Sequence, residues 1–115
     1  MITPTERDWK HMKKIHDDLL ARLCKRINTK ASAIIENPDV SEHKKYLAVY
    51  EHIQNSDDIV AQCFNDWRRS NILMKIASIK REKLFTEEEF EVLSENIRNS
   101  VTTLLNIYGE SARNG

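Results

Sequence analysis

The chain has 115 residues, a length typical of a single domain that can bury a core without a metal or disulfide. Its 18 basic residues balance its 18 acidic ones, so no net charge draws it to nucleic acid or to an anionic membrane. Only two glycines and two prolines interrupt the chain, and this scarcity predicts long helices with short connections.

The sequence shows no targeting or membrane-spanning pattern. Its first residues form no apolar stretch of the kind found in signal peptides. The longest uncharged apolar-rich run, residues 99–109, is shorter than the ~20 residues that a membrane span needs. Cys24 and Cys63 lack the spacing of a redox or metal motif. We therefore expect a cytoplasmic protein with reduced thiols.

The first predicted helix covers residues 4–36. Thr3 and Glu6 match a capping box, with Pro4 at the first helical position. One apolar stripe follows at steps of three and four residues, formed by Trp9, Met12, His16, Leu19, Leu20, Leu23 and Ile27. The pattern resumes further on, at Ala31, Ile34 and Ile35, and ends before Pro38.

A second helix is predicted to begin at Asp39 or Ser41, since either residue can cap it. Its apolar stripe consists of Tyr46, Leu47, Tyr50 and Ile53. Residues 55–58 then favour caps and turns, so the helix either breaks there or bends and continues. We expect a break.

The third segment changes its apolar face part of the way along. Its first half places four residues on one side: Val60, Cys63, Phe64 and Trp67. After the polar residues 68–71, Met74 continues this face. The side chains of Ile72, Ile76 and Ile79 lie more than ~90° away from it. The segment is therefore apolar on two sides.

The last helix has the clearest start, with a capping box of Thr86 and Glu89 and a hydrophobic staple of Phe85 and Phe90. A repeating apolar stripe continues through Phe90, Leu93, Ile97, Val101, Leu104 and Tyr108. Gly109 is the expected stop, and residues 110–115 are expected to fray. No segment alternates as a strand does. The predicted fold class is all-α, as one antiparallel bundle of three or four helices over residues 1–115.

Charge is unevenly distributed along the chain. Six basic residues cluster between positions 68 and 83: Arg68, Arg69, Lys75, Lys80, Arg81 and Lys83. Five acids follow within residues 87–95. In an antiparallel bundle the two runs are expected to lie beside each other and neutralise one another. The alternative is that the basic stretch contacts phosphates, as in a small nucleic-acid-binding regulator.

Candidate sites for chemistry are few. The sequence contains no nucleophile motif, phosphate loop or Glu-x-x-His pair, so we expect no enzyme, no catalytic residue, no cofactor and no metal. His16 is interpreted as a hydrogen-bonded histidine at the core boundary. Cys24 and Cys63 are interpreted as packing residues, although Lys25 and Arg26 make Cys24 the better candidate for a reactive thiol.

The remaining class is a non-catalytic protein-interaction or regulatory module, expected to be a homodimer. Its predicted partner is a second copy of the chain or another protein. We expect no contact with a membrane, and we expect nucleic acid only in the alternative above. The predicted interface combines two apolar sets that exceed what a small bundle can cover: Ile72, Ile76 and Ile79, and Ala31, Ile34 and Ile35. The competing interpretation is a kink near residues 68–71 that folds these side chains into the chain's own core.

Overall fold

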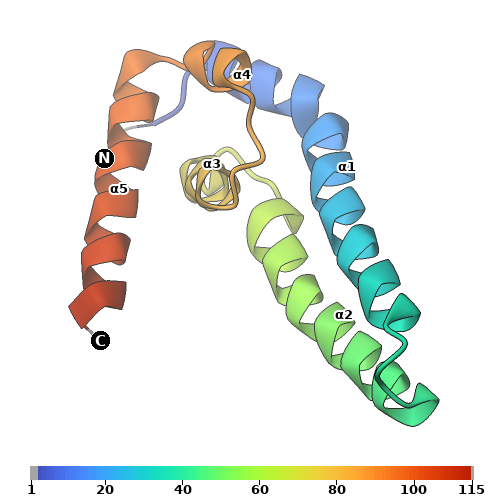
Figure 1. Ribbon diagram of the computed structural model, residues 1–115. Helices are drawn as coiled ribbons and strands as arrows, with labels where there is room; N and C mark the ends of the chain where they lie inside the picture. Colours follow the sequence, from blue (N-terminus) through green and yellow to red (C-terminus); the bar gives the residue numbers. More distant parts are fainter. Residues whose placement is uncertain (1–2, 115) are drawn as a thin grey trace.

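Five helices form the chain, and the computed structural model describes the backbone of residues 3–114 and the side chains of residues 3–107 (Figure 1). The helices are α1 (Glu6–Glu36), α2 (Glu42–Phe64), α3 (Ile72–Arg81), α4 (Glu87–Glu91) and α5 (Glu95–Asn114). Helix accounts for 78% of the residues, and the described part of the chain contains no strand. The all-α prediction is confirmed.

The helices divide into a compact body and a projecting arm. α1 and α2 form a long antiparallel hairpin, α3 lies between this hairpin and α5, and α4 lies over the first part of α1 (Figure 1). The far half of the hairpin, residues 27–55, extends beyond α3, and we call it the arm. The Cα radius of gyration is 16.8 Å, whereas a compact chain of this length would have about 13 Å.

α3 is the central helix of the body, which explains why it is apolar on two sides. It contacts α2 on one side and α5 on the other. Ile72, Ile76 and Ile79 are fully buried within the single chain. Their prediction as partner-interface residues is therefore wrong, and the competing interpretation holds: the chain leaves α2 after Phe64 and folds them into its own core.

One predicted helix start differs from the structure, and the structure decides between the two alternatives for another. α1 is capped by Thr5 with Asp8 at the third helical position, instead of by Thr3 with Glu6. Asp8 also binds Ser94 through its side chain, and this long-range contact selects the later cap. For α2, Ser41 is the cap, since its hydroxyl accepts from the backbone of Lys44.

α2 continues through residues 55–58, where a break was expected. Ser56 is buried and donates its hydroxyl to the carbonyl of His52, so a turn-forming residue stays within the helix. The chain breaks instead between Phe64 and Ile72. In that connection Asp66 has a φ of 57°, and the Asn71 amide donates to the Asp66 carbonyl.

The last predicted helix is divided in two, which raises the number of helices to five. The Thr86–Glu89 capping box is confirmed at the start of α4. The helix nevertheless stops after Glu91, and α5 begins at Glu95. Ser94 lies at the break, where its backbone and hydroxyl both donate to Asp8. The backbone of α5 passes through Gly109 to Asn114, so the expected stop is wrong, whereas residue 115 lies outside the described residues.

Candidate functional site

The two helices of the arm meet through small and polar side chains. α2 turns Ala48, His52 and Ser56 toward α1, and all three are at least half-buried. The His52 ring nitrogen Nε2 lies 2.9 Å from the Ile27 carbonyl oxygen of α1. The arm is thus held together by few large apolar contacts.

Within the arm, α1 leaves the apolar stripe of α2 exposed. Tyr46 and Tyr50 are 67% and 58% exposed, and Ile53 is 40% exposed. Ile35 of α1 is 53% exposed beside them. Five of the eight large hydrophobic side chains that are exposed among the described residues fall between positions 35 and 53. Exposed apolar residues gathered in this way mark binding surfaces.

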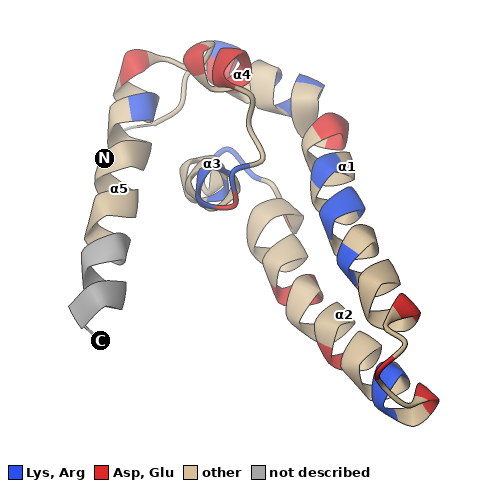
Figure 2. Cartoon of the chain, viewed as in Figure 1, with Lys and Arg blue, Asp and Glu red and all other residues tan. Residues whose placement is uncertain are grey.

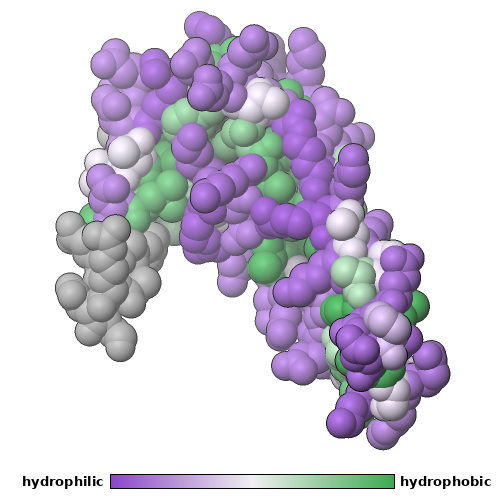
Figure 3. Space-filling view, in the orientation of Figure 1, coloured by the Kyte–Doolittle hydropathy of each residue, from purple (hydrophilic) through white to green (hydrophobic). Residues whose placement is uncertain are grey.

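These residues surround a shallow groove of about 460 Å³. We call this groove and its walls the tip surface, formed by Ile35, Tyr46, Val49, Tyr50 and Ile53. Glu42 and Lys45 close one end, where Lys45 Nζ lies 3.1 Å from Glu42 Oε1. Figure 3 shows hydrophobic side chains among hydrophilic ones at the far end of the arm.

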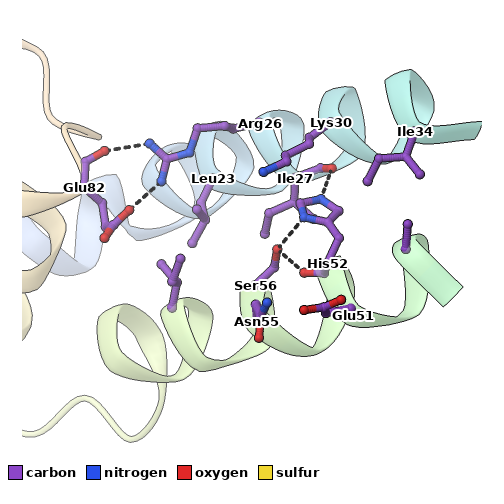
Figure 4. A pocket seen from close by; sticks show the side chains of 12 residues that line it. Leu23, Arg26, Ile27, Lys30, Ile34, Glu51, His52, Asn55, Ser56 and Glu82 are labelled. Carbon is purple, nitrogen blue, oxygen red and sulfur yellow. Dashed lines mark hydrogen bonds and ion pairs between the residues drawn. The ribbon is translucent and has the colours of Figure 1, made fainter. Parts of the chain in front are cut away.

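A second, more polar groove runs along the opposite side of the arm, with a volume of about 620 Å³ (Figure 4). Its floor contains Leu23, Ile27 and Ile59. At one end the Arg26 guanidinium donates to both the carbonyl and the side chain of Glu82, at 2.8 Å each. Arg26 and Glu82 thus satisfy one another, and the arrangement contains no unpaired buried polar atom that indicates a ligand.

The other predicted interface residues lie on the arm. Ala31 and Ile34 are half-buried, and Ile34 lines the polar groove. Only Ile35 of this set belongs to the tip surface. The first helix therefore does expose apolar surface near its end, but a single residue carries most of it.

The basic stretch does not form one free surface, because most of its members bind within the chain. Arg69 pairs with Glu6 and lies over the Trp9 ring. Lys75 donates to the carbonyls of Ala61 and Gln62, which lie near the end of α2.

The other basic side chains have different neighbours. Arg68 pairs with Asp66, Arg81 binds Gln62, and Lys80 lies 4.3 Å from the Phe90 ring centroid. Lys83 is exposed and has a φ of 61°.

The acidic start of α4 pairs with α1 through Glu89, which corrects the expected pairing with the basic stretch. The Arg22 guanidinium donates to both Glu89 carboxylate oxygens, at 2.6 and 3.1 Å. Among the described ion pairs, none joins the basic stretch to the acids of residues 87–95. Figure 2 shows the acidic α4 lying across the first part of α1.

Two carboxylates tie α1 to the start of α4 and α5. Burial opposes the charge of Asp8, but four hydrogen bonds from Thr5 and Ser94 outweigh it and hold the pKa of Asp8 below its ordinary value. Burial likewise opposes the charge of Glu89, and the bonds from Arg22 and Thr86 lower its pKa. Both carboxylates have structural partners that account for their charge.

His16 and Cys63 have neighbours that account for them structurally, whereas Cys24 is exposed. His16 is half-buried, with its ring edge-on to Trp67 at 4.6 Å, and it bonds Asp17, as predicted for a boundary histidine. Burial raises the pKa of the Cys63 thiol to about 11, which keeps it protonated. Cys24 is exposed, so its predicted packing role is wrong.

No group of three or more His, Cys, Asp or Glu residues in the described part of the chain is arranged to hold a metal ion. Within the same residues, no helix combines the length and apolar character of a membrane span. Comparison with protein-family models, curated proteins and solved structures finds no match to this chain.

The sequence pattern contains the residues of the tip surface, but it does not indicate that they are exposed. The stripe of Tyr46, Tyr50 and Ile53 is visible in the sequence, where it was predicted as the apolar stripe of the second helix. Helical periodicity identifies an apolar face and leaves open what covers it. The sequence does contain a signal for the exposed stripe, which is the second face of α2 formed by Ala48, His52 and Ser56. The small and polar side chains of this face allow close approach to α1.

Proposed function

We propose that the chain is a non-catalytic protein-interaction module and that the tip surface is where it binds. One observation carries the proposal: the apolar stripe of α2 within the projecting arm is exposed while small and polar side chains face α1. Folding alone offers no reason to expose Tyr46, Tyr50 and Ile53 together. A bound protein that covers them would gain the free energy of burying that apolar area.

The composition of the tip surface supports a protein partner. Tyrosine is enriched in protein interfaces because its ring offers a large apolar area and its hydroxyl can still bond water or a polar partner. The groove between the apolar residues is shallow, and the ion pair of Glu42 and Lys45 supplies a polar rim. An apolar centre with a polar rim is the usual anatomy of such a contact.

Site-specific photo-crosslinking in living cells tests this function. A benzophenone amino acid placed at Tyr46 should form covalent adducts with a protein, whereas the same group at Lys14, exposed on the body, should form at least tenfold fewer. Equal yields at the two positions would show that the arm does not bind protein there. Adducts with a second copy and adducts with a different protein both support the function.

The alternative, nucleic-acid binding through the basic stretch, predicts a different behaviour. Retention on nucleic acid would fall steeply as salt rises, since each phosphate contact releases a counterion. It would also fall in an Arg68→Ala/Lys83→Ala variant and be unaffected by Tyr46→Glu. The in-chain partners of Arg69, Lys75 and Arg81 favour the interaction module.

A further inference from the structure

The tip surface has a spacing that reads the same in both directions along α2. Its four residues on this helix are Tyr46, Val49, Tyr50 and Ile53, separated by steps of three, one and three. Two copies of such a stripe can pack antiparallel about a two-fold axis midway between Val49 and Tyr50. Tyr46 of each copy then lies level with Ile53 of the other, so that an aromatic ring meets an aliphatic side chain at both ends.

Resting on the proposed function, we infer that the partner of the tip surface is a second copy of this chain. A two-fold contact uses one surface twice, and the symmetric stripe fits that requirement. In this arrangement the two α2 helices meet along their stripes and Ile35 of each α1 lies beside the contact. Two hairpins together make a four-helix arrangement that covers what a single arm leaves open.

Each end of the antiparallel stripe carries charged residues of both signs. Glu42 lies four residues before Tyr46, and Asp57 lies four residues after Ile53. The contact therefore places Glu42 of one copy level with Asp57 of the other, and Lys45, whose Nζ lies 3.1 Å from Glu42 Oε1, supplies the positive charge at this end.

The accessible area sets the expected strength of the dimer. The exposed fractions of the four large tip-surface side chains range from 40% to 67%, which corresponds to roughly 400–500 Å² of apolar area per chain. Two copies and their polar rims together reach the lower limit of specific interfaces, about 1,000–1,200 Å² in total. We expect a dimer that exchanges with monomer at a dissociation constant on the order of 10 µM.

Light scattering on the wild-type chain and two matched variants tests the inference. Wild type should change from the 13.5-kDa chain mass to twice that mass between about 1 and 200 µM. Tyr50→Glu should weaken the dimer at least tenfold and leave the helical circular dichroism unchanged, because Tyr50 is exposed in the single chain. Leu47→Glu is the control: Leu47 is equally apolar and 47% exposed, but it points about 100° away from Tyr46 on the helix.

Disulfide crosslinking tests the predicted register. Val49 lies nearest the two-fold axis, so Val49→Cys in a Cys24→Ser background should crosslink to its own copy under mild oxidation. Glu51→Cys on the other side of α2 should not. The buried Cys63 stays out of the reaction.

The outcomes separate the inference from the function on which it rests. A wild-type chain that is still monomeric at 200 µM, or Tyr50→Glu and Leu47→Glu variants that weaken the dimer equally, overturns the second copy as partner. If Tyr46 photo-crosslinks to a different protein while the chain is monomeric, the interaction module stands and this inference is wrong. If Tyr46 gives no adduct above the Lys14 control, both fail.

Discussion

The body and the arm of this chain are stabilised by different means. In the body, α3 is enclosed by α2 and α5, and large side chains such as Met12, Ile76 and Ile97 are completely buried. In the arm, two helices meet through Ala48, His52 and Ser56, and no large apolar side chain between positions 28 and 55 is buried. The comparison shows that one continuous helix, α2, can contribute to a packed core at one end and expose its apolar stripe at the other.

The largest effect is expected where the body is most completely packed. Ile76→Glu would bury a carboxylate among apolar side chains of α3 and its neighbours, with no partner for the charge. We expect the variant to be unfolded at 25 °C and neutral pH. Circular dichroism should show the loss of helix, and a folded Ile76→Glu would contradict the placement of α3 at the centre of the core.

Shortening one side chain in α5 and one in the turn before it measures the packing of the body more finely. Leu93→Ala and Ile97→Ala each remove a fully buried side chain and should lower the free energy of unfolding by roughly 2–5 kcal/mol. Urea denaturation monitored by helical circular dichroism gives the value. Losses below about 0.5 kcal/mol at both positions would mean that α5 does not pack as described.

The Asp8 carboxylate makes the stability of the body depend on pH. Its pKa is lowered in the folded chain, so its contribution is complete above the unfolded value of about 3.9 and disappears as pH falls through the folded value. Asp8→Asn should cost about 1–3 kcal/mol at pH 7, and the difference from wild type should shrink toward pH 2.

Urea midpoints measured between pH 7 and pH 2 check this dependence. Asp58→Asn, at an exposed carboxylate of α2, is the control and should change the midpoints little. A gap between wild type and Asp8→Asn that stays constant with pH would show that the Asp8 charge does not stabilise the fold.

The smallest effect is expected on the tip surface of the arm. Tyr46→Ser removes a side chain that is 67% exposed, so the stability of the monomer should change by no more than about 0.5 kcal/mol. The measurement should be made below 1 µM chain, where self-association does not contribute. A loss comparable to that of Ile97→Ala would show that Tyr46 packs within its own chain and would contradict the comparison.

The sequence predicted the fold class and most of the body, because stripes such as Leu19, Leu23 and Ile97 face one continuous core. The prediction failed where contacts between residues far apart in the sequence determine where a helix begins or ends. The cap of α1 and the break before α5 both depend on the bond between Asp8 and Ser94, 86 residues apart. Likewise, the periodicity of Ile72, Ile76 and Ile79 indicated a second apolar face, and only the position of α3 between α2 and α5 shows what covers it.

The two cysteines differ in exposure, so the rates at which their thiols are labelled report on opening of the native chain. Cys24 is exposed on α1, whereas Cys63 is buried where α2 enters the body, with its pKa raised to about 11. At pH 8 a thiol reagent should label Cys24 directly, and it should reach Cys63 only in molecules whose body has opened. The slower labelling rate therefore measures how often the junction between arm and body opens in the native chain, without any substitution.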